Sequence, residues 1–464
     1  MLHQDNIAYW VQAAQPYLTA STPHSLLETR PHFDVAIIGG GFTGLWLAYY
    51  LKKAQPQLSI ALFEAKQIAY GASGRNGGWL STNLPGVTAQ LLKQPHINAE
   101  DIIRLQHHIG TTLSEVAQAC QQEGIDCDLH QGGMLTIATN PAQKARLQQL
   151  YAHQLACGFT PETLSLLSAT EARQRLNSPT VTAALYHHQG ARIQPAKLAF
   201  GLKATIMGLG VSVFEHMPVT AFDARSVTLP QQTLSVDRVI CCTEAYSDRL
   251  LHTRHVMPIN SAIIATQVLP DAFWAEAGWQ QRELLGDLAH VFMYAQRTAD
   301  NRIILGGRGS PYRYNAQHAG HGHLHPHTVQ MLSQRLQALF PWQDFHVEHA
   351  WCGSLGVTRN WCPTVQYDPH RGVGLIYGFA GHGVAATHLA ARTMVDRILD
   401  QNSARTSLPW NDFVTPKWPI EPFRWLGIHA LYKMLAYADK RERHSQQSTT
   451  PFLAHLAYTL GGMN

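Results

Sequence analysis

The sequence predicts a mixed α/β fold in which two domains are interleaved along the chain. Residues 35–64 have the pattern of a strand, a glycine turn, a helix and a second strand, which is a β-α-β unit typical of parallel sheets. Beyond that unit, predicted helices and strands alternate only in patches, so we expect the two domains to exchange chain segments. A chain of 464 residues is long enough for about two domains.

The predicted elements follow the periodicity of apolar residues. The opening unit consists of a strand at 35–38, a helix at 45–53 and a strand at 59–64. Residues 1–30 are mixed and polar, and we expect them to form an arm on the surface. The other predicted helices are 101–122, 142–157, 195–209 and 384–399, and the other predicted strands are 211–215, 236–242, 303–306 and 375–378.

The composition is that of a globular protein, with 45% hydrophobic and 14% charged residues. A formal net charge of +4 does not favour nucleic-acid binding. The seven cysteines have neither the spacing of a zinc site nor the density of a disulfide scaffold, so we expect a reducing cytoplasm. The sequence shows neither a signal peptide nor an apolar run of transmembrane length, so membrane association is not expected.

A glycine loop between the first strand and the first helix matches the pattern G-x-G-x-x-G. Gly39 permits a tight turn, Gly41 lets a pyrophosphate approach the backbone, and Gly44 lets the helix pack on the strand. The helix N-terminus offers unpaired N–H groups to phosphates. Glu64 ends the second strand, and its carboxylate can accept both hydroxyls of a ribose. These residues predict a Rossmann-like dinucleotide site, whose loop is Gly39-Gly40-Gly41-Phe42-Thr43-Gly44.

Two further glycine clusters indicate that the dinucleotide is FAD. The cluster after Glu64 has a bare backbone that can wrap a pyrophosphate and then lie flat against a ring system. It reads Gly71-Ala72-Ser73-Gly74-Arg75-Asn76-Gly77-Gly78. The cluster before the last predicted helix places a helix N-terminus where it would stabilise negative charge at the flavin N1–C2=O edge on reduction. It reads Gly378-Phe379-Ala380-Gly381-His382-Gly383.

These motifs resemble those of the D-amino-acid-oxidase superfamily of flavoproteins, and most closely those of its gamma-glutamylputrescine oxidase-like group. The matching segments are 34–44, 64–78, 190–219, 298–302 and 378–392. The resemblance implies a Rossmann-like FAD-binding domain interleaved with a substrate domain built on a mostly antiparallel sheet. The implied FAD-binding segments are 31–90, 165–250 and 350–405, the implied substrate segments are 91–164 and 251–349, and 406–464 is a C-terminal extension.

The same resemblance assigns contacts with the cofactor. It implies that Glu64 holds the adenosine ribose and that Val219, in a short strand after 211–215, meets the adenine through its backbone. The residues implied to line the pyrophosphate and the flavin are Ser73, Arg75, Asn76 and Gly77. Those implied to hold the pyrimidine edge of the ring are Gly381, His382, Gly383 and Val384. Further expected contacts come from Phe42, Thr43, Ala65, Gly74, Gly78 and Thr243.

The resemblance also implies the chemistry, in which an amine gives hydride to flavin N5 and the imine is then hydrolysed. An aromatic pocket favours the neutral amine by desolvation, so no acid–base pair is required. The candidates for its wall, each of them otherwise an ordinary core or surface aromatic, are Trp79, Tyr294, Tyr312 and Trp361. Arg308, between glycines after a predicted strand, is a pocket candidate with a surface ion pair as the alternative.

The expected substrate is an amine without a nearby carboxylate, similar to gamma-glutamylputrescine. Sarcosine oxidases hold the substrate carboxylate with a lysine where this chain has Ala385, and they carry an oxygen-activating lysine where it has Ile304. Electrons would pass to oxygen or to another acceptor. The alternatives are an oxidase or dehydrogenase for sarcosine, glycine or a D-amino acid, and an aminophosphonate oxidase with a cation from Arg308 or Arg313. A third alternative is a flavin-binding protein without catalytic activity.

We expect FAD to bind without a covalent bond. Cys352 provides the alternative, because its spacing from Gly378 resembles that of the cysteine that carries the flavin in monomeric sarcosine oxidases. We expect no metal site, since the tract at 318–327, with its five histidines, is typical of a solvated loop. The tail at 425–443 is expected to be a helix docked on the body of the protein.

Overall fold

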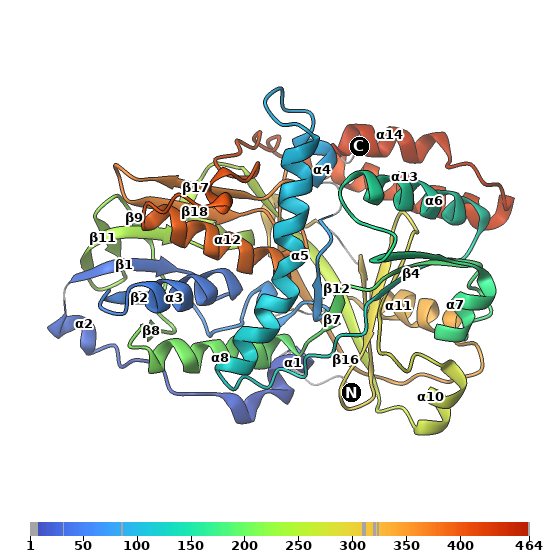
Figure 1. Ribbon diagram of the computed structural model, residues 1–464, viewed down its shortest axis with the longest axis horizontal. Helices are drawn as coiled ribbons and strands as arrows, with labels where there is room; N and C mark the ends of the chain where they lie inside the picture. The colour runs from blue at the N-terminus through green and yellow to red at the C-terminus, as the bar shows by residue number, and fades with distance from the viewer. Residues whose placement is uncertain are drawn as a thin grey trace.

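The computed structural model describes residues 8–30, 32–84, 87–308, 312–318, 322 and 324–462. These residues form two large sheets in the two halves of the molecule, and the long helix α5 (Ala99–Gln122) runs between the halves (Figure 1). A third, two-stranded sheet pairs β3 (Trp79–Ser81) with β7 (Gly190–Arg192). The arrangement confirms the predicted mixed α/β fold.

The first sheet is the parallel sheet that the β-α-β pattern predicts. Its strands, in spatial order, are β17 (Thr364–Asp368), β18 (Val373–Tyr377), β11 (Thr233–Cys241), β1 (His32–Ile38), β2 (Ile60–Phe63) and β8 (Ser212–Phe214). Only the edge strand β17 is antiparallel in this order. A hairpin of β9 (Ala221–Phe222) and β10 (Ser226–Thr228) pairs with β11. The helices of this half are α2 (Leu26–Thr29), α3 (Phe42–Ala54), α8 (Pro195–Gly208), α9 (Asp248–Leu251) and α12 (Gly383–Ile398).

The second sheet is mostly antiparallel, as the resemblance implied. Its order is β16 (Val347–Thr358), β12 (Val256–Thr266), β15 (Ile303–Arg308), β14 (Met293–Arg297), β13 (Leu284–Asp287), β4 (Met134–Ala138), β6 (Ala183–His187) and β5 (Leu164–Leu167). Only β13 and β4 pair in parallel. Its helices are α6 (Pro141–Ala156), α7 (Ala169–Arg175), α10 (Asp271–Ala277) and α11 (Pro326–Leu339).

The alternation of side chains along β12 gives the second sheet two different faces. Ala262 and Ile264 point into a core shared with α11. Ile263 and Ala265 instead join the core that contains α3 and α12 of the first half. One face of the second sheet therefore packs toward the α/β half, and the site described below lies along this face.

Two expectations about the fold were wrong. Val219 lies in no strand, because β8 ends at Phe214 and the chain continues as a loop packed on the core of the first sheet. The described part of the arm at 1–30 does not lie on the surface alone, because some of its side chains are buried. Trp10 in α1 (Tyr9–Ala13) is 2% exposed, because its indole packs between the two halves of the molecule.

The domain boundaries remain a prediction. The segment 165–250 was expected to belong to the FAD-binding domain, but β5 and β6, which lie at its start, join the second sheet.

The C-terminal extension forms the helices α13 (Phe423–Ser445) and α14 (Phe452–Gly461). Glu442 fastens α13 to the body, because its carboxylate accepts two hydrogen bonds from Arg146 at 2.6 and 2.7 Å and one from His290 at 2.9 Å. Asp439 accepts the backbone N–H groups of His290 and Val291. The helices among the described residues are all too short or too polar to cross a membrane.

The ion pair of Glu442 should contribute to stability above acidic pH. Burial alone would raise its pKa, but the hydrogen bonds from Arg146 and His290 lower it to about 2. The ionised carboxylate therefore stabilises the fold above pH 4.5, its ordinary pKa, and this contribution is lost as the pH falls toward 2. We expect Glu442→Gln to lower the unfolding free energy at pH 7 by about 3 kcal/mol, and by much less near pH 3. Urea titrations at both pH values measure this difference.

Glu276→Gln, at an exposed glutamate of α10, is the matched control for this experiment. An equally small loss in both variants at pH 7 would show that Glu442 does not anchor the extension.

Candidate FAD site between the two sheets

The first glycine loop restricts side chains at the three positions that the motif requires. Gly39 has a φ of +112°, which an L side chain rarely adopts. A Cβ at Gly44 would lie 2.1 Å from the carbonyl oxygen of Gly39, and a Cβ at Gly41 would lie 3.0 Å from Ser73 Oγ. Ser73 in turn accepts a hydrogen bond from Phe42 N–H at 2.9 Å, which joins the second glycine cluster to the N-terminus of α3.

Glu64 stands directly after β2, beside this loop. Its Oε2 accepts the backbone N–H of Gly40 and its Oε1 that of Lys66, both at 2.9 Å. Burial raises the pKa of Glu64, and the backbone hydrogen bonds oppose that shift. An ionised carboxylate has about four acceptor positions, so two remain for the hydroxyls of a ribose.

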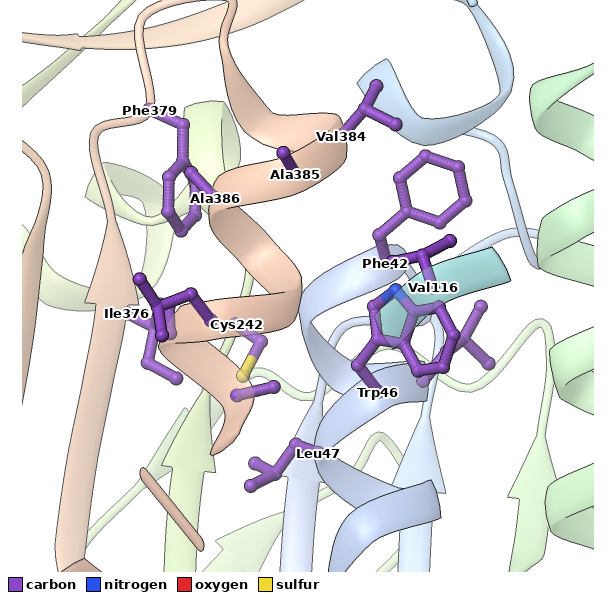
Figure 2. Packing of buried hydrophobic residues seen from close by; sticks show 14 of the residues in the cluster. Phe42, Trp46, Leu47, Val116, Cys242, Ile376, Phe379, Val384, Ala385 and Ala386 are labelled. Atoms are coloured by element: carbon purple, nitrogen blue, oxygen red, sulfur yellow. The ribbon is translucent and has the colours of Figure 1, made fainter. Parts of the chain in front are cut away.

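The third glycine cluster leads into α12, whose N-terminus lies beside that of α3. Figure 2 shows the two helices packed together, with Phe42 in the first turn of α3 and Val384 in the first turn of α12. Gly378 and Gly381 have φ values of +92° and +101°. The positive ends of two helix dipoles therefore lie side by side, which suits an anionic group.

Glu244 fixes the third cluster to β11 and β16. Its carboxylate accepts the backbone N–H groups of Gly378 at 2.8 Å, Phe379 at 3.2 Å and Gly356 at 3.1 Å. Burial raises the pKa of Glu244 to about 7, against the effect of these three hydrogen bonds. Glu244 is thus a structural tie for the loop of the third glycine cluster.

The second glycine cluster is held by three side chains from distant segments, which bind three consecutive carbonyl groups. Trp351 Nε1 donates to Arg75 O at 3.0 Å, and Trp10 Nε1 donates to Asn76 O at 2.7 Å. Gln296 Nε2 donates to Gly77 O at 2.5 Å. We refer to these three contacts as the carbonyl clamp.

The carbonyl clamp leaves backbone donors for a ligand. Among the described residues, no acceptor meets the N–H of Asn76 or of Gly77, and Gly77 is buried. Buried N–H groups are almost always paired, so the unpaired N–H of the buried Gly77 indicates a bound acceptor. The three bare glycine loops, the paired helix N-termini, Glu64 and these donors together fit FAD.

Two of the predicted aromatic residues meet beside the second cluster. Tyr294 and Trp79 pack edge to face with ring centroids 6.0 Å apart, and Tyr294 donates to or accepts from Ser261 Oγ at 2.9 Å. A Cβ at Gly77 would lie 2.5 Å from the Tyr294 ring, and one at Gly306 would lie 2.1 Å from it. Glycines thus make space for this ring. The role of Trp79 and Tyr294 in binding a substrate stays a prediction.

Tyr312 and Trp361 do not belong to this aromatic pair, because they pack with Met257 and Ile259 beneath the C-terminal extension. Tyr312 is 1% exposed and donates to Glu421 Oε1 at 2.6 Å beneath the C-terminal extension. Trp361 Nε1 donates to the carbonyl of Gly461 at 3.0 Å. The backbone of Arg308 pairs with Ser261 at the end of β15, and its side chain lies outside the described residues.

The other predicted cofactor residues surround the three loops. Arg75 donates to the carbonyls of Tyr70 at 2.8 Å and Cys352 at 3.1 Å, which orients this arginine along the second cluster. Thr243 shares a hydrogen bond with Ser247 at 3.0 Å next to the Glu244 tie. Burial lowers the pKa of His382 to about 4, so its ring is neutral at pH 7. The positions next to Glu64 and within the clusters are Ala65, Thr43, Gly74, Gly78 and Gly383.

The described histidines of the tract at 318–327 make separate contacts and do not form one cluster. His318 stacks on Tyr246 with ring centroids 4.2 Å apart, and His325 caps α11 by accepting the N–H of His327. His321 and His323 lie outside the described residues.

Sequence reasoning missed the carbonyl clamp and the function of Glu244. A lone tryptophan in a polar N-terminal segment carries no signal of a partner near residue 76. Glu244 likewise carries no local signal of its function, because its three N–H donors come from segments more than a hundred residues away.

The carbonyl clamp should be measurable in the affinity for FAD. Trp10→Phe keeps the packed ring but leaves Asn76 O without its donor, which costs about 1–3 kcal/mol. We expect the dissociation constant of FAD from the apoprotein to rise about tenfold. Trp410→Phe is the control, because no described residue accepts a hydrogen bond from the buried Trp410 Nε1. Equal FAD affinity in both variants would contradict the function of the clamp.

Gly41→Val should abolish FAD binding, because a branched side chain would occupy the space of the pyrophosphate beside Ser73. The purified protein should carry about one FAD per chain, and the variant less than about a tenth of that, by absorbance. Gly208→Val is the control, since a Cβ at Gly208 in α8 meets nothing within 4 Å. A yellow Gly41→Val protein would contradict the assignment of this loop.

FAD should leave the protein on acid denaturation. Cys352 pairs with Ala262, whose side chain lies on the α11 face, so the thiol points away from the face that carries Trp351. Burial raises the pKa of Cys352 to about 11, which keeps the thiol protonated and a poor nucleophile. After acid precipitation the yellow colour should remain in the supernatant, whereas a yellow pellet would establish a covalent bond.

Comparisons with known proteins agree with this site. The model of the DAO family, described as FAD dependent oxidoreductase, matches residues 34–397. Gamma-glutamylputrescine oxidoreductase of Escherichia coli (strain K12) is 27% identical over 448 residues, which cover 94% of this chain and 98% of that protein. The probable oxidoreductase OrdL of Haemophilus influenzae is 26% identical and covers 79% of this chain and 83% of its own length.

Among solved structures, glycine oxidase from Geobacillus kaustophilus superposes with a TM-score of 0.66 at 18% identity, covering 80% of this chain and 96% of that one. The shared architecture supports the fold described above. The comparisons confirm the predicted cofactor, FAD, and the predicted enzyme class, an FAD-dependent oxidoreductase. With a family match that spans residues 34–397, the chain belongs to the DAO family of FAD-dependent oxidoreductases.

Proposed function

We propose that this enzyme oxidises the C–N bond of an amine that carries no carboxylate beside its reacting nitrogen. One observation carries the proposal. Ala385 stands where the resemblance to sarcosine oxidases would place the lysine that binds the substrate carboxylate, and it is 1% exposed within an apolar core. A substrate carboxylate in apolar surroundings without a paired cation costs several kcal/mol.

The aromatic residues support the same proposal. Tyr294 and Trp79 present an apolar surface next to Gly77, and such a surface favours the neutral amine by desolvation. Burial raises the pKa of Tyr294 to about 12, so the phenol keeps its proton at neutral pH and holds Ser261. Bound FAD supplies the hydride acceptor, and the residues of this face orient the amine and exclude water.

The relative from Escherichia coli is named for gamma-glutamylputrescine, whose reacting amine lies far from its carboxylate. The match covers nearly the whole of both chains, which favours an amine of this kind as substrate. Glycine oxidase is also a relative, at 21% identity for the Geobacillus kaustophilus protein, so an amino-acid oxidase is the rival function. An aminophosphonate oxidase with a cation from Arg308 or Arg313 is a further rival.

Steady-state turnover separates these functions. We expect kcat/KM for the best of a panel of amines, including gamma-glutamylputrescine, to exceed that for every α-amino acid by at least about tenfold. The panel should contain sarcosine, glycine, D-alanine and aminomethylphosphonate as rivals. Preference for sarcosine, glycine or a D-amino acid would reject the amine proposal, and preference for the phosphonate would favour the other rival.

A further inference from the structure

A cavity of about 290 Å³ lies between the second sheet and the C-terminal extension. Met257 and Ile259 of β12 and Val357 of β16 line one side. The other side comes from Trp418 and from α13 and α14, which follow the segment matched by the family model. This volume is large enough for several water molecules or for a short carbon chain.

The cavity adjoins the candidate FAD site along one face of the sheet. Met257, Ile259 and Ser261 are every second residue along β12, so their side chains lie on the same face of the sheet. Ser261 is hydrogen-bonded to Tyr294. Ile259 pairs with Leu355, and the side chain of Leu355 lies 3.5 Å from the position of a Cβ at Gly381. Ala380 of the third glycine cluster packs on the same apolar group as Met257 and Ile259.

The lining defines the chemistry of a ligand. Most of its residues are apolar, and its charged residues are the two arginines Arg359 and Arg424. Arg424 is neutralised by Glu421 at 3.2 Å. The guanidinium of Arg359 lies over Trp418, 5.2 Å from the ring centroid, and no acidic side chain of the described residues pairs with it. The cavity therefore suits an apolar chain that ends in an anion.

We propose that this cavity receives the apolar chain of the amine substrate, and that Arg359 binds a carboxylate at the far end of that chain. This inference rests on the proposed function and names the substrate class as an ω-amino carboxylate or its close analogue. The reacting nitrogen then lies on the side of Tyr294, and the charged end lies several carbon atoms away under the C-terminal extension.

Two substitutions test the two parts of the cavity. Gly427 of α13 lines the cavity and a Cβ there meets nothing within 4 Å, so Gly427→Leu adds apolar bulk at the cavity without a clash at Cβ. Leucine also favours a helix more than glycine does. Arg359→Met removes the charge and keeps a long side chain over Trp418. Gly208→Leu in α8 is the matched control, because a Cβ there also meets nothing within 4 Å.

Calorimetric titration of the FAD-loaded protein with hexanoate measures the cavity without turnover. Hexanoate has the apolar chain and the carboxylate but no amine. We expect Gly427→Leu and Arg359→Met each to weaken its binding about tenfold, and Gly208→Leu to leave it unchanged. Equal binding in all four proteins would overturn the proposal.

Turnover provides the second measurement. In Gly427→Leu, kcat/KM should fall about tenfold more for hexylamine than for ethylamine. In Arg359→Met it should fall about tenfold more for 6-aminohexanoate than for hexylamine. An equal loss of kcat/KM for the two substrates compared in either variant would overturn the assignment of the cavity. Hexanoate binding that responds as expected, in a protein that oxidises no amine, would reject the proposed function and uphold the ligand chemistry of the cavity.

Discussion

The candidate site depends on the carbonyl clamp, in which Trp351, Trp10 and Gln296 bind the carbonyls of Arg75, Asn76 and Gly77. A glycine-rich segment has the largest conformational entropy to lose, so it adopts one conformation only where other groups hold it. The three donors come from β16, α1 and β14, which connects the flavin-side backbone to both the N-terminal segment and the second sheet. Because each donor binds a carbonyl, the N–H groups of Asn76 and Gly77 remain for the cofactor.

The same face of the second sheet continues from the clamp to the C-terminal extension. At one end it packs against the α/β half through Ile263 and Trp351, and at the other it is covered by α13. Glu442 and Asp439 hold that helix in place through buried polar contacts. Cofactor binding and the apolar cavity are thus built on one continuous surface, while the opposite face packs on α11.

The turn geometry of the glycine clusters and the position of Glu64 after β2 could be predicted because turns and helix N-termini depend on neighbouring residues. Several helices were predicted for the same reason, among them the helix expected at 101–122, which spans Ala99–Gln122. Tyr312 shows the limit, because nothing in its sequence neighbourhood indicates Glu421 as its partner. The strand expected around Val219 failed because pairing with other strands, and not local propensity, decides where a strand ends.

Anaerobic mixing of the purified, FAD-loaded enzyme with amines tests the central claim most directly, because it observes the flavin without an assumed electron acceptor. The account predicts that an amine without a nearby carboxylate bleaches the visible absorbance of the flavin, and that sarcosine and glycine do so much more slowly. A flavin that no amine reduces, or that glycine or sarcosine reduces fastest, would contradict it.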